Sequence, residues 1–148
     1  MDLYSINYLH YGKPKFWYIV DLDCNDKFEG VANTYFKDLY KECPEFLRHK
    51  TTLIEPKILL KKGIRLRKVI QHEREFVIAR DRAYHSGFNA GFNIAEAINF
   101  ALPAWIPSGQ TAGYCKCIPD SVNINMDLFI STLYGDDPEQ IPKQVLLN

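Results

Sequence analysis

Two pairs of metal-ligating side chains stand in distant parts of this sequence, and they constrain its fold more than any other feature. Cys43 and His49 form the first pair, and Cys115 and Cys117 form the second. Two cysteines separated by one residue strain a mutual disulfide, whereas both thiolates can reach one ion. Three thiolates and one imidazole make a closed tetrahedral zinc set. We therefore expect a structural zinc site, which requires the fold to bring the two pairs together.

Each member of this set also has a simpler interpretation. The spacings are not those of a common zinc finger, so spacing alone leaves the alternatives open. Cys43 and the remaining cysteine, Cys24, are also typical of small buried hydrophobic residues. His49 lies between Arg48 and Lys50, in a run that is also typical of a surface segment. No role is predicted for Cys24.

Length and charge exclude several classes of protein. The 148 residues allow one domain with a real core. Lys plus Arg is 18 and Asp plus Glu is 18, so no surplus positive charge favours nucleic acid or an anionic membrane. Aromatic residues make up 14% of the chain, which is too rich for a disordered segment. With no signal peptide and no apolar run of membrane-spanning length, we expect a compact, soluble, non-secreted domain.

Strand signals dominate both ends of the sequence. Residues 3–11 alternate between two faces, and residues 15–21 do so again after Gly12-Lys13-Pro14, which predicts an antiparallel hairpin. Further strands are expected from Arg65 onward, over residues 76–78 and over residues 92–100. Several short antiparallel strands separated by turn residues indicate a sandwich or barrel.

Helical periodicity lies mainly in the middle of the chain. Apolar residues between Asp26 and Tyr40 follow one helical stripe, with Asp26 as the expected N-cap. Shorter helices are expected over residues 44–48, from Pro56 to Gly63 and over residues 126–133, whereas Pro103 and Pro107 break the pattern. We therefore expect a mainly β, α+β domain with a helical insertion at residues 26–62 and a C-terminal zinc and helical region at residues 113–148.

Polar residues within the strand-like segments mark candidate binding positions. A Gly-Phe-Asn triplet occurs twice within residues 87–93, where glycine permits positive φ or close backbone approach. His85 precedes the first triplet, at a strand end where jelly-roll oxygenases commonly place a metal ligand, although a lone histidine is more often a core or surface group. Asn7, Lys15 and Trp17 could line one concave face, with Lys15 as a charge for a carboxylate. The alternative is that Lys15 points into water.

Four motifs, in this order, resemble those of the Jumonji-C (JmjC) family. They are Tyr4-Ser5-Ile6-Asn7-Tyr8-Leu9-His10-Tyr11-Gly12, Pro14-Lys15-x-Trp17-Tyr18, Phe46-Leu47-Arg48-His49-Lys50 and Tyr84-His85-Ser86-Gly87-Phe88-Asn89-x-Gly91-Phe92-Asn93. The resemblance runs from about Leu3 to Phe129. The Cys43, His49, Cys115 and Cys117 set resembles the zinc site of the histone lysine demethylases that carry both Jumonji-N and Jumonji-C domains.

The resemblance implies a partial double-stranded β-helix, a cupin-like jelly roll, that binds structural zinc, Fe(II) and the co-substrate 2-oxoglutarate. In such a dioxygenase, two histidines and one carboxylate hold the iron, and a hydroxylated N-methyl group is lost as formaldehyde. The resemblance also implies a methyl-lysine histone tail in chromatin as the partner, and a nuclear location.

Residue roles follow from the resemblance, position by position. His85 resembles the distal iron-binding histidine. Lys15 resembles the lysine that pairs with the far carboxylate of 2-oxoglutarate, Asn7 its hydrogen-bonding partner, and Trp17 the pocket wall. Two further positions correspond to a lysine near the iron, Lys50, and to a polar group near the substrate channel, Asn99.

The sequence departs from the family at the iron site. Two ligands one residue apart on a strand point to the same side, so a His-x-Asp or His-x-Glu pair is needed. None of the 4 histidines is followed by an acidic residue at that spacing. In family members the pair lies just before the segment that corresponds to residues 1–4. We therefore expect an incomplete iron site and an inactive chain in isolation.

Three accounts of the function stay open. The chain is the C-terminal portion of a JmjC histone demethylase domain, or it is a degenerate, zinc-stapled chromatin-binding or scaffold module. The exposed sheet edges of a jelly roll without its opening strands favour the first account. The third account is a protein hydroxylase of the same superfamily, since fold and cofactor do not fix the substrate.

Smaller departures from the family pattern concern the substrate. Ala97 and Ile98 replace hydroxyl-bearing residues beside the methylammonium pocket, so neither the target lysine nor its methylation state is predicted. Arg74 stands where the family commonly has glycine.

Overall fold

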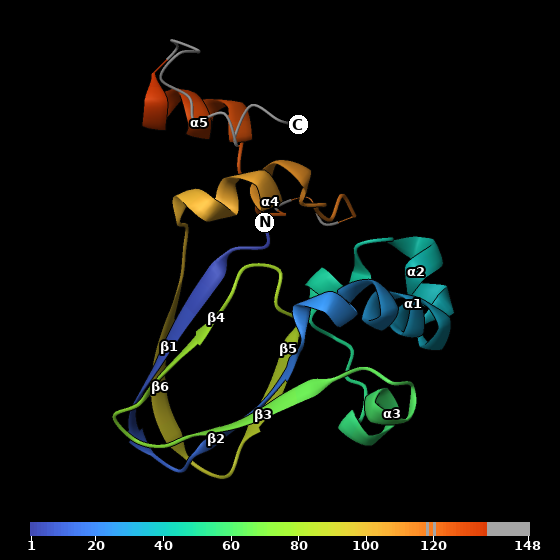
Figure 1. The fold of residues 1–148 in the computed structure, drawn as a ribbon, viewed down its shortest axis with the longest axis vertical. Helices are drawn as coiled ribbons and strands as arrows, with labels where there is room; N and C mark the ends of the chain where they lie inside the picture. The colour runs from blue at the N-terminus through green and yellow to red at the C-terminus, as the bar shows by residue number, and fades with distance from the viewer. Residues whose placement is uncertain (118, 120, 136–148) are drawn as a thin grey trace.

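The structure is a computed structural model, and it describes residues 1–117, 119 and 121–135. Two sheets form the lower part of the view in Figure 1, and helices lie beside and above them. Part of the region predicted at residues 113–148 lies outside the described residues. The strands are β1 (Tyr4–Gly12), β2 (Lys15–Val20), β3 (Leu66–Gln71), β4 (Phe76–Ala79), β5 (His85–Asn89) and β6 (Asn93–Phe100). The helices are η1 (Leu22–Cys24), α1 (Asn25–Tyr35), α2 (Lys37–Glu42), η2 (Phe46–His49), α3 (Pro56–Lys61), η3 (Pro103–Trp105), α4 (Ile106–Thr111) and α5 (Met126–Tyr134), of which η1, η2 and η3 are 3-10 helices.

Two three-stranded antiparallel sheets face each other. Sheet A has the order β4-β1-β6, and sheet B has the order β3-β2-β5. The sheets lie close together at the β1–β2 and β5–β6 connections and diverge toward the helices (Figure 1). The chain crosses between the two sheets at every connection except β2 to β3, as in a double-sheet jelly roll. The predicted fold class, mainly β with inserted helices, is confirmed.

The predicted hairpin of the first two strands is wrong. β1 pairs with β4 and β6, whereas β2 pairs with β3 and β5, so the two strands lie in different sheets. Gly12, with φ of +103°, and the proline that follows carry the chain from one sheet to the other. A Cβ at Gly12 would lie 2.5 Å from the carbonyl oxygen of Phe92, the residue just before β6. Alternation reveals which residues share a face of a strand, but it does not reveal which strand is the neighbour.

The helices differ from the sequence prediction at two points. The stripe between Asp26 and Tyr40 is not one helix, because Phe36 has a non-helical backbone (φ −115°, ψ 44°) that separates α1 from α2. Asp26 lies in the first turn of α1, and the N-cap residue is Cys24. Pro103 and Pro107 stand in the first turns of η3 and α4, where a missing N–H costs nothing.

The helix predicted after Pro56 ends as expected. Gly63 follows α3 with φ of +70°, a conformation that glycine adopts readily at helix ends. The helix predicted over residues 126–133 is α5. Asn125 caps α5, because its side chain accepts a hydrogen bond from the Leu128 N–H at 3.0 Å.

Two clusters of buried apolar residues hold the helices on the sheets. The larger cluster joins the end of β2 to the helical segment, and it consists of Val20, Cys24, Ala32, Cys43, Phe46, Ile54, Leu59, Ile64 and Cys115. The smaller cluster surrounds Trp105, whose indole N–H donates to the Met1 carbonyl at 2.8 Å. This contact holds the entry to β1 against the helices above the sheets.

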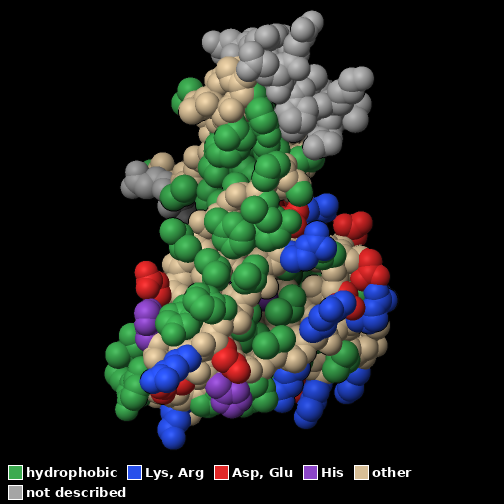
Figure 2. Space-filling model, turned by 60° about the vertical axis from the view of Figure 1, so that its left-hand side comes forward, with side chains coloured by type: hydrophobic (Ala, Val, Ile, Leu, Met, Phe, Trp, Pro, Cys, Tyr) green, Lys and Arg blue, Asp and Glu red, His purple; other side chains and the backbone are tan. Residues whose placement is uncertain are grey.

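The outer face of sheet A is apolar and open. The register places Ile78, Ile6 and Ile98 side by side across its three strands, and Ile98 is 68% exposed. Figure 2 shows hydrophobic side chains gathered over this side of the molecule. Within the part of the chain that the structure describes, no helix has the length and hydrophobicity to cross a membrane.

Candidate functional site

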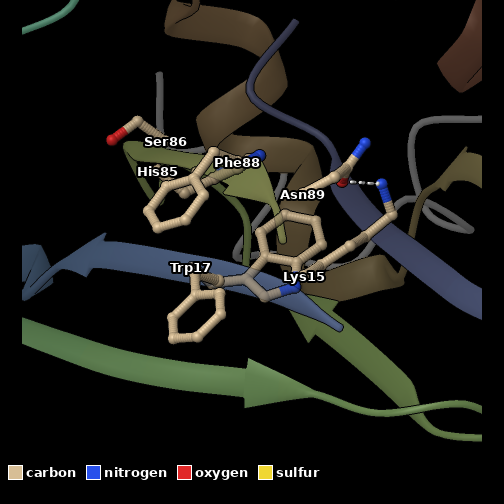
Figure 3. Close-up of a pocket in the computed structure, with 8 residues that line it drawn as sticks. Lys15, Trp17, His85, Ser86, Phe88 and Asn89 are labelled. Carbon is tan, nitrogen blue, oxygen red and sulfur yellow. Dashed lines mark hydrogen bonds between the residues drawn. The ribbon is translucent and has the colours of Figure 1, made fainter. Parts of the chain in front are cut away.

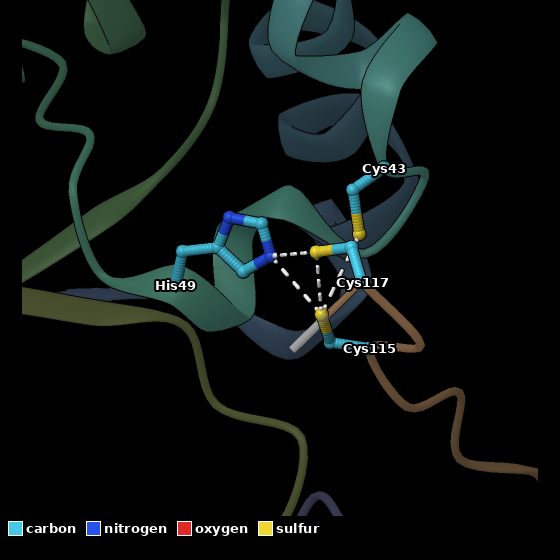
Figure 4. A group of neighbouring side chains, drawn as sticks. All are labelled: Cys43, His49, Cys115 and Cys117. Carbon is cyan, nitrogen blue, oxygen red and sulfur yellow. Dashed lines mark hydrogen bonds between the residues drawn. The ribbon is translucent and has the colours of Figure 1, made fainter. Parts of the chain in front are cut away.

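The fold brings the two predicted metal-ligand pairs together. Cys43 follows α2 and His49 ends η2, while Cys115 and Cys117 lie in the segment after α4 (Figure 4). Their four ligand atoms all lie within 4.8 Å of one another. The His49 Nε2 atom lies 3.1 Å from the sulfur of Cys115 and 3.3 Å from that of Cys117. The expectation that distant segments converge at these residues is confirmed.

The donor set fits a tetrahedral zinc ion. Zn–S bonds of about 2.3 Å in tetrahedral geometry place sulfur atoms about 3.8 Å apart. The Cys43 and Cys115 sulfurs are 3.8 Å apart, and the Cys115 and Cys117 sulfurs are 3.0 Å apart. Both separations exceed the roughly 2.05 Å of a disulfide bond. Cys43 and Cys115 are each 5% exposed, whereas Cys117 is exposed, so an ion here would be shielded from water on one side only.

The thiols influence one another's protonation. The hydrogen bond from Cys117 is the main cause that lowers the pKa of Cys115 to about 6. The same interaction raises the pKa of Cys117 to about 12. Cys115 is therefore more readily deprotonated than Cys117, and a thiolate is the form that ligates metal.

The structure supports the simpler interpretation for Cys24 but not for His49. Cys24 is 5% exposed in the larger apolar cluster and does not belong to the metal-ligand group, so it is a buried hydrophobic residue. His49 is half-buried and points at sulfur rather than into water.

A second group of polar side chains lies in a pocket between β2 and β5. Lys15, Phe16 and Trp17 line it from β2, and residues 85–89 line it from β5 (Figure 3). The register pairs Lys15 with Asn89, Trp17 with Gly87 and Ile19 with His85. Opposite residues of an antiparallel pair share a face, so Lys15, Trp17 and His85 all lie on one side of sheet B.

Lys15 has the chemistry of a carboxylate-binding residue. Its Nζ atom donates to the Asn89 Oδ1 atom at 2.8 Å (Figure 3). Among the described residues, no carboxylate lies within 4 Å of this ammonium group. The cation is half-buried and held by a neutral acceptor, which leaves its charge available for an anionic ligand.

His85 has one ring nitrogen fixed by the backbone. Its Nδ1 atom lies 2.8 Å from the Ala83 carbonyl oxygen. A carbonyl only accepts hydrogen bonds, so Nδ1 carries the proton and Nε2 keeps its lone pair. This is the usual arrangement of a metal-binding histidine. The Trp17 ring lies 5.8 Å from the His85 ring, centroid to centroid.

Asn7 lies on sheet A, and Gln71 links it to sheet B. The Oδ1 atom of Asn7 is buried and has no hydrogen-bond partner among the described residues. The Gln71 side chain donates to the Asn7 carbonyl at 3.1 Å and accepts from the Trp17 indole at 3.0 Å. A buried polar atom without a partner is costly and points to a ligand or water that satisfies it.

The remaining predicted site residues, Asn99 and Lys50, lie outside sheet B: Asn99 is on β6 of sheet A, and Lys50 follows η2. Asn99 pairs with Ser5, two residues from Asn7, and therefore shares the face of Asn7. Ala97 is the direct register partner of Asn7. Lys50 follows η2 with φ of +57°, and its side chain is exposed.

Arg74 adopts φ of +68° in the turn before β4. This left-handed backbone conformation favours glycine, which accounts for the residue that the family commonly has here. Its N–H donates to the Leu9 carbonyl at 2.7 Å, which holds the turn against β1.

A model of the family described as "JmjC domain, hydroxylase" matches residues 1–100 of this sequence. That match covers all six strands, the pocket residues of β2 and β5, and the first metal-ligand pair, Cys43 and His49. The chain belongs to the JmjC family.

Three proteins named as lysine-specific demethylases, one of them as probable, are similar to most of this chain. The chain is 45% identical to probable lysine-specific demethylase 4F of Homo sapiens, over 94% of this chain and 22% of that protein. It is 46% identical to lysine-specific demethylase 4B of Mus musculus, over 95% of this chain and 13% of that protein. It is also 46% identical to lysine-specific demethylase 4D of Rattus norvegicus, over 90% of this chain and 26% of that protein. The chain thus spans about a quarter or less of the length of these relatives.

Two residues that hydrogen-bond Lys15 and Trp17 were not singled out from the sequence as site residues. Asn89 belongs to the first Gly-Phe-Asn triplet, and this motif could have identified it. Gln71 ends an ordinary strand, and no sequence signal distinguished it from a surface residue.

Proposed function

We propose that this chain is the part of a JmjC histone lysine demethylase that binds 2-oxoglutarate and supplies one iron ligand, with a structural zinc ion beside it. The observation that carries the proposal is the convergence of Lys15, Trp17 and His85 on one face of sheet B. In this proposal the partner is a methyl-lysine histone tail and the location is the nucleus, in keeping with the names of the relatives.

The residues of the pocket fit 2-oxoglutarate. The Lys15 ammonium pairs with its far carboxylate, since the only described partner of that group is the neutral Asn89 oxygen. The side-chain NH2 group of Asn7 donates to an oxygen of the same molecule, while the buried Oδ1 atom of Asn7, an acceptor, needs a separate donor such as water. Trp17 forms one wall of the pocket beside Lys15, and a bound ligand would cover this contact, which is exposed in the free chain. An ion pair that excludes water is stronger than one in bulk solvent.

In the proposal, the described residues supply a complete ligand set for zinc but only one ligand for iron. Cys43, His49, Cys115 and Cys117 hold zinc, which joins the helical segment to the chain after α4. The described residues offer His85 as the distal iron ligand, and no described histidine begins a His-x-Asp or His-x-Glu pair that would supply the other two. Iron with bound 2-oxoglutarate supplies oxygen activation in such enzymes. A facial site needs three protein donors, so the described residues alone do not complete it.

In the proposal, His85 contributes one nitrogen donor to the iron, its Nε2 atom. The Ala83 carbonyl fixes the ring, and Nε2 presents a lone pair beside Trp17. Lys50 and Asn99 are proposed as residues near the iron and the substrate channel, respectively.

The incomplete donor set favours a second candidate function, a zinc-stapled chromatin-binding or scaffold module. Such a module needs the fold and the zinc, but it needs neither the Lys15 charge nor a 2-oxoglutarate pocket. Binding of 2-oxoglutarate therefore separates the two candidates.

The test is a calorimetric titration of the zinc-loaded chain with 2-oxoglutarate. We expect saturable binding that Lys15→Met weakens by about 10- to 100-fold, because a charge-assisted hydrogen bond contributes roughly 1.5–3 kcal/mol. Lys13→Met is the matched control, since Lys13 is an exposed lysine in the turn before β2. Equal affinity in the two variants would contradict the proposal, and absence of saturable binding in the wild type would favour the scaffold.

A further inference from the structure

Gln71 is a buried polar side chain whose hydrogen bonds are all directed at the pocket strands and the adjoining turn. It ends β3 and has 0% exposure. Its carboxamide makes three hydrogen bonds: it accepts from the Trp17 Nε1 atom at 3.0 Å and donates to the carbonyls of Asn7 and Glu75 at 3.1 and 2.9 Å. Both amide hydrogens and the amide oxygen are therefore in use.

The chemistry of the partners fixes the orientation of this amide. An indole N–H only donates, so the atom facing Trp17 must be the Gln71 oxygen. The two backbone carbonyls only accept, so the nitrogen must face them. A carboxylate or a hydrocarbon side chain at this position cannot reproduce the set.

Gln71 connects the strands that carry the three residues assigned to 2-oxoglutarate. It is the direct register partner of Lys15 on sheet B. It contacts the Trp17 indole on β2, and it reaches the backbone of Asn7 on β1 in the opposite sheet. This one side chain thus hydrogen-bonds the Trp17 indole on sheet B and the backbone of sheet A.

We propose that Gln71 is the positioning residue of the 2-oxoglutarate pocket: its three hydrogen bonds hold the Trp17 wall and the Asn7 strand at the distance from Lys15 that the ligand requires. This inference rests on the proposed function. Gln71 acts through Trp17 and Asn7 and does not itself touch the ligand.

A merely structural role would lower stability without changing affinity in the folded protein. The two roles separate when affinity and the environment of Trp17 are measured at a temperature where each variant is folded. The chain has 2 tryptophans, so labelling with 5-fluorotryptophan gives two fluorine NMR signals. Trp105 is fully buried in the smaller apolar cluster and reports on folding.

The test compares Gln71→Met with Ile70→Met by 2-oxoglutarate titration and fluorine NMR. Ile70 is the neighbouring residue on β3, and it is 41% exposed on the outer face of sheet B. We expect Gln71→Met to shift the Trp17 signal, leave the Trp105 signal in place and weaken 2-oxoglutarate binding by roughly tenfold or more. Ile70→Met should retain the wild-type affinity. A folded Gln71→Met chain that binds within twofold of the wild type would overturn the inference.

Two further measurements keep the inference testable if Gln71→Met does not fold. Gln71→Glu keeps the acceptor for Trp17 and loses both donors, so it should retain the Trp17 signal and still bind 2-oxoglutarate at least tenfold more weakly. In the wild type, the Trp17 indole N–H should exchange with water more slowly than an exposed indole, and exchange at the exposed rate would refute the hydrogen bond. Failure of the wild type to bind 2-oxoglutarate would instead count against the proposed function.

Discussion

Replacing one zinc ligand and one buried cysteine outside the metal-ligand group isolates the contribution of the metal. Cys43 and Cys24 belong to the same apolar cluster, and each is 5% exposed. Only Cys43 lies among the four ligands. Cys43→Ser and Cys24→Ser therefore bury the same new hydroxyl in comparable surroundings, at a cost of about 1–3 kcal/mol each.

The difference between the two variants comes from zinc. Structural zinc contributes about 10–16 kcal/mol of apparent binding free energy in small domains, which is comparable to the roughly 5–15 kcal/mol total stability of a typical domain. Cys24→Ser should lower the melting temperature by about 2–12 °C, at roughly 2–4 °C per kcal/mol for a chain of this size. Cys43→Ser should lose its zinc, and its helical segment should unfold well below the melting temperature of Cys24→Ser.

Thermal unfolding followed by circular dichroism, with metal analysis and with or without a chelator, measures this. The wild type and Cys24→Ser should each hold one zinc per chain and lose stability when EDTA is added. Cys43→Ser should hold none and be insensitive to EDTA. A wild-type chain that is folded without zinc, or equal melting temperatures for the two variants, would show that zinc at Cys43 does not stabilise the fold.

Two further predictions concern the sheets. Gly87→Ala should destabilise the chain in urea unfolding, because a Cβ at this position would lie 2.1 Å from the Phe16 carbonyl oxygen and β5 would have to move away from β2; unchanged stability would show that this close approach does not exist. Asp21→Asn should reduce the stability that is present above the ordinary carboxyl pKa, because the hydrogen bond from Arg67, followed by that from Arg65, lowers the pKa of Asp21 in the folded chain. A group whose pKa is lowered by folding loses its contribution as the pH falls through the folded value, so the wild-type and Asp21→Asn melting curves should differ at pH 5 and converge toward pH 2. A gap that widens in acid would contradict the assignment.

Local patterns predicted the elements of this fold better than their partners. Alternation located β1 and β2 correctly, but the short Gly12-to-Pro14 connection suggested a hairpin where the chain crosses between sheets. β1 is paired on both sides by β4 and β6, and β2 is paired on both sides by β3 and β5, so neither can pair with the other. No pattern within residues 3–21 contains that information. Family resemblance implied the jelly roll, whereas alternation alone left sandwich and barrel open.

Helix prediction failed where tertiary packing overrides a local signal. The apolar stripe continues through Phe36, yet the backbone breaks there and the Phe36 ring packs 5.9 Å from that of Phe46. Pro103 and Pro107 indicated an interruption, although proline is equally at home in a first helical turn. The choice between the two depends on Trp105, whose burial holds this segment against the sheets.

The candidate sites followed from chemistry that the sequence displays directly. Cysteine and histidine pairs are rare enough for the metal-ligand group to be found before its geometry is known, and the structure brings its four ligand atoms together. Gln71 was missed because glutamine is usually exposed. Its role depends on the distance between two sheets, which has no signature in the strand that carries it.

We propose that Lys15, which is unpaired with any carboxylate among the described residues, recognises the far carboxylate of 2-oxoglutarate. Comparing the affinities of two ligands for the wild-type chain tests this role directly. 2-Oxobutyrate keeps the 2-oxo acid group and lacks that carboxylate. Calorimetry of the zinc-loaded chain should show 2-oxoglutarate binding at least about tenfold more tightly than 2-oxobutyrate. Equal affinities for the two ligands would contradict the account.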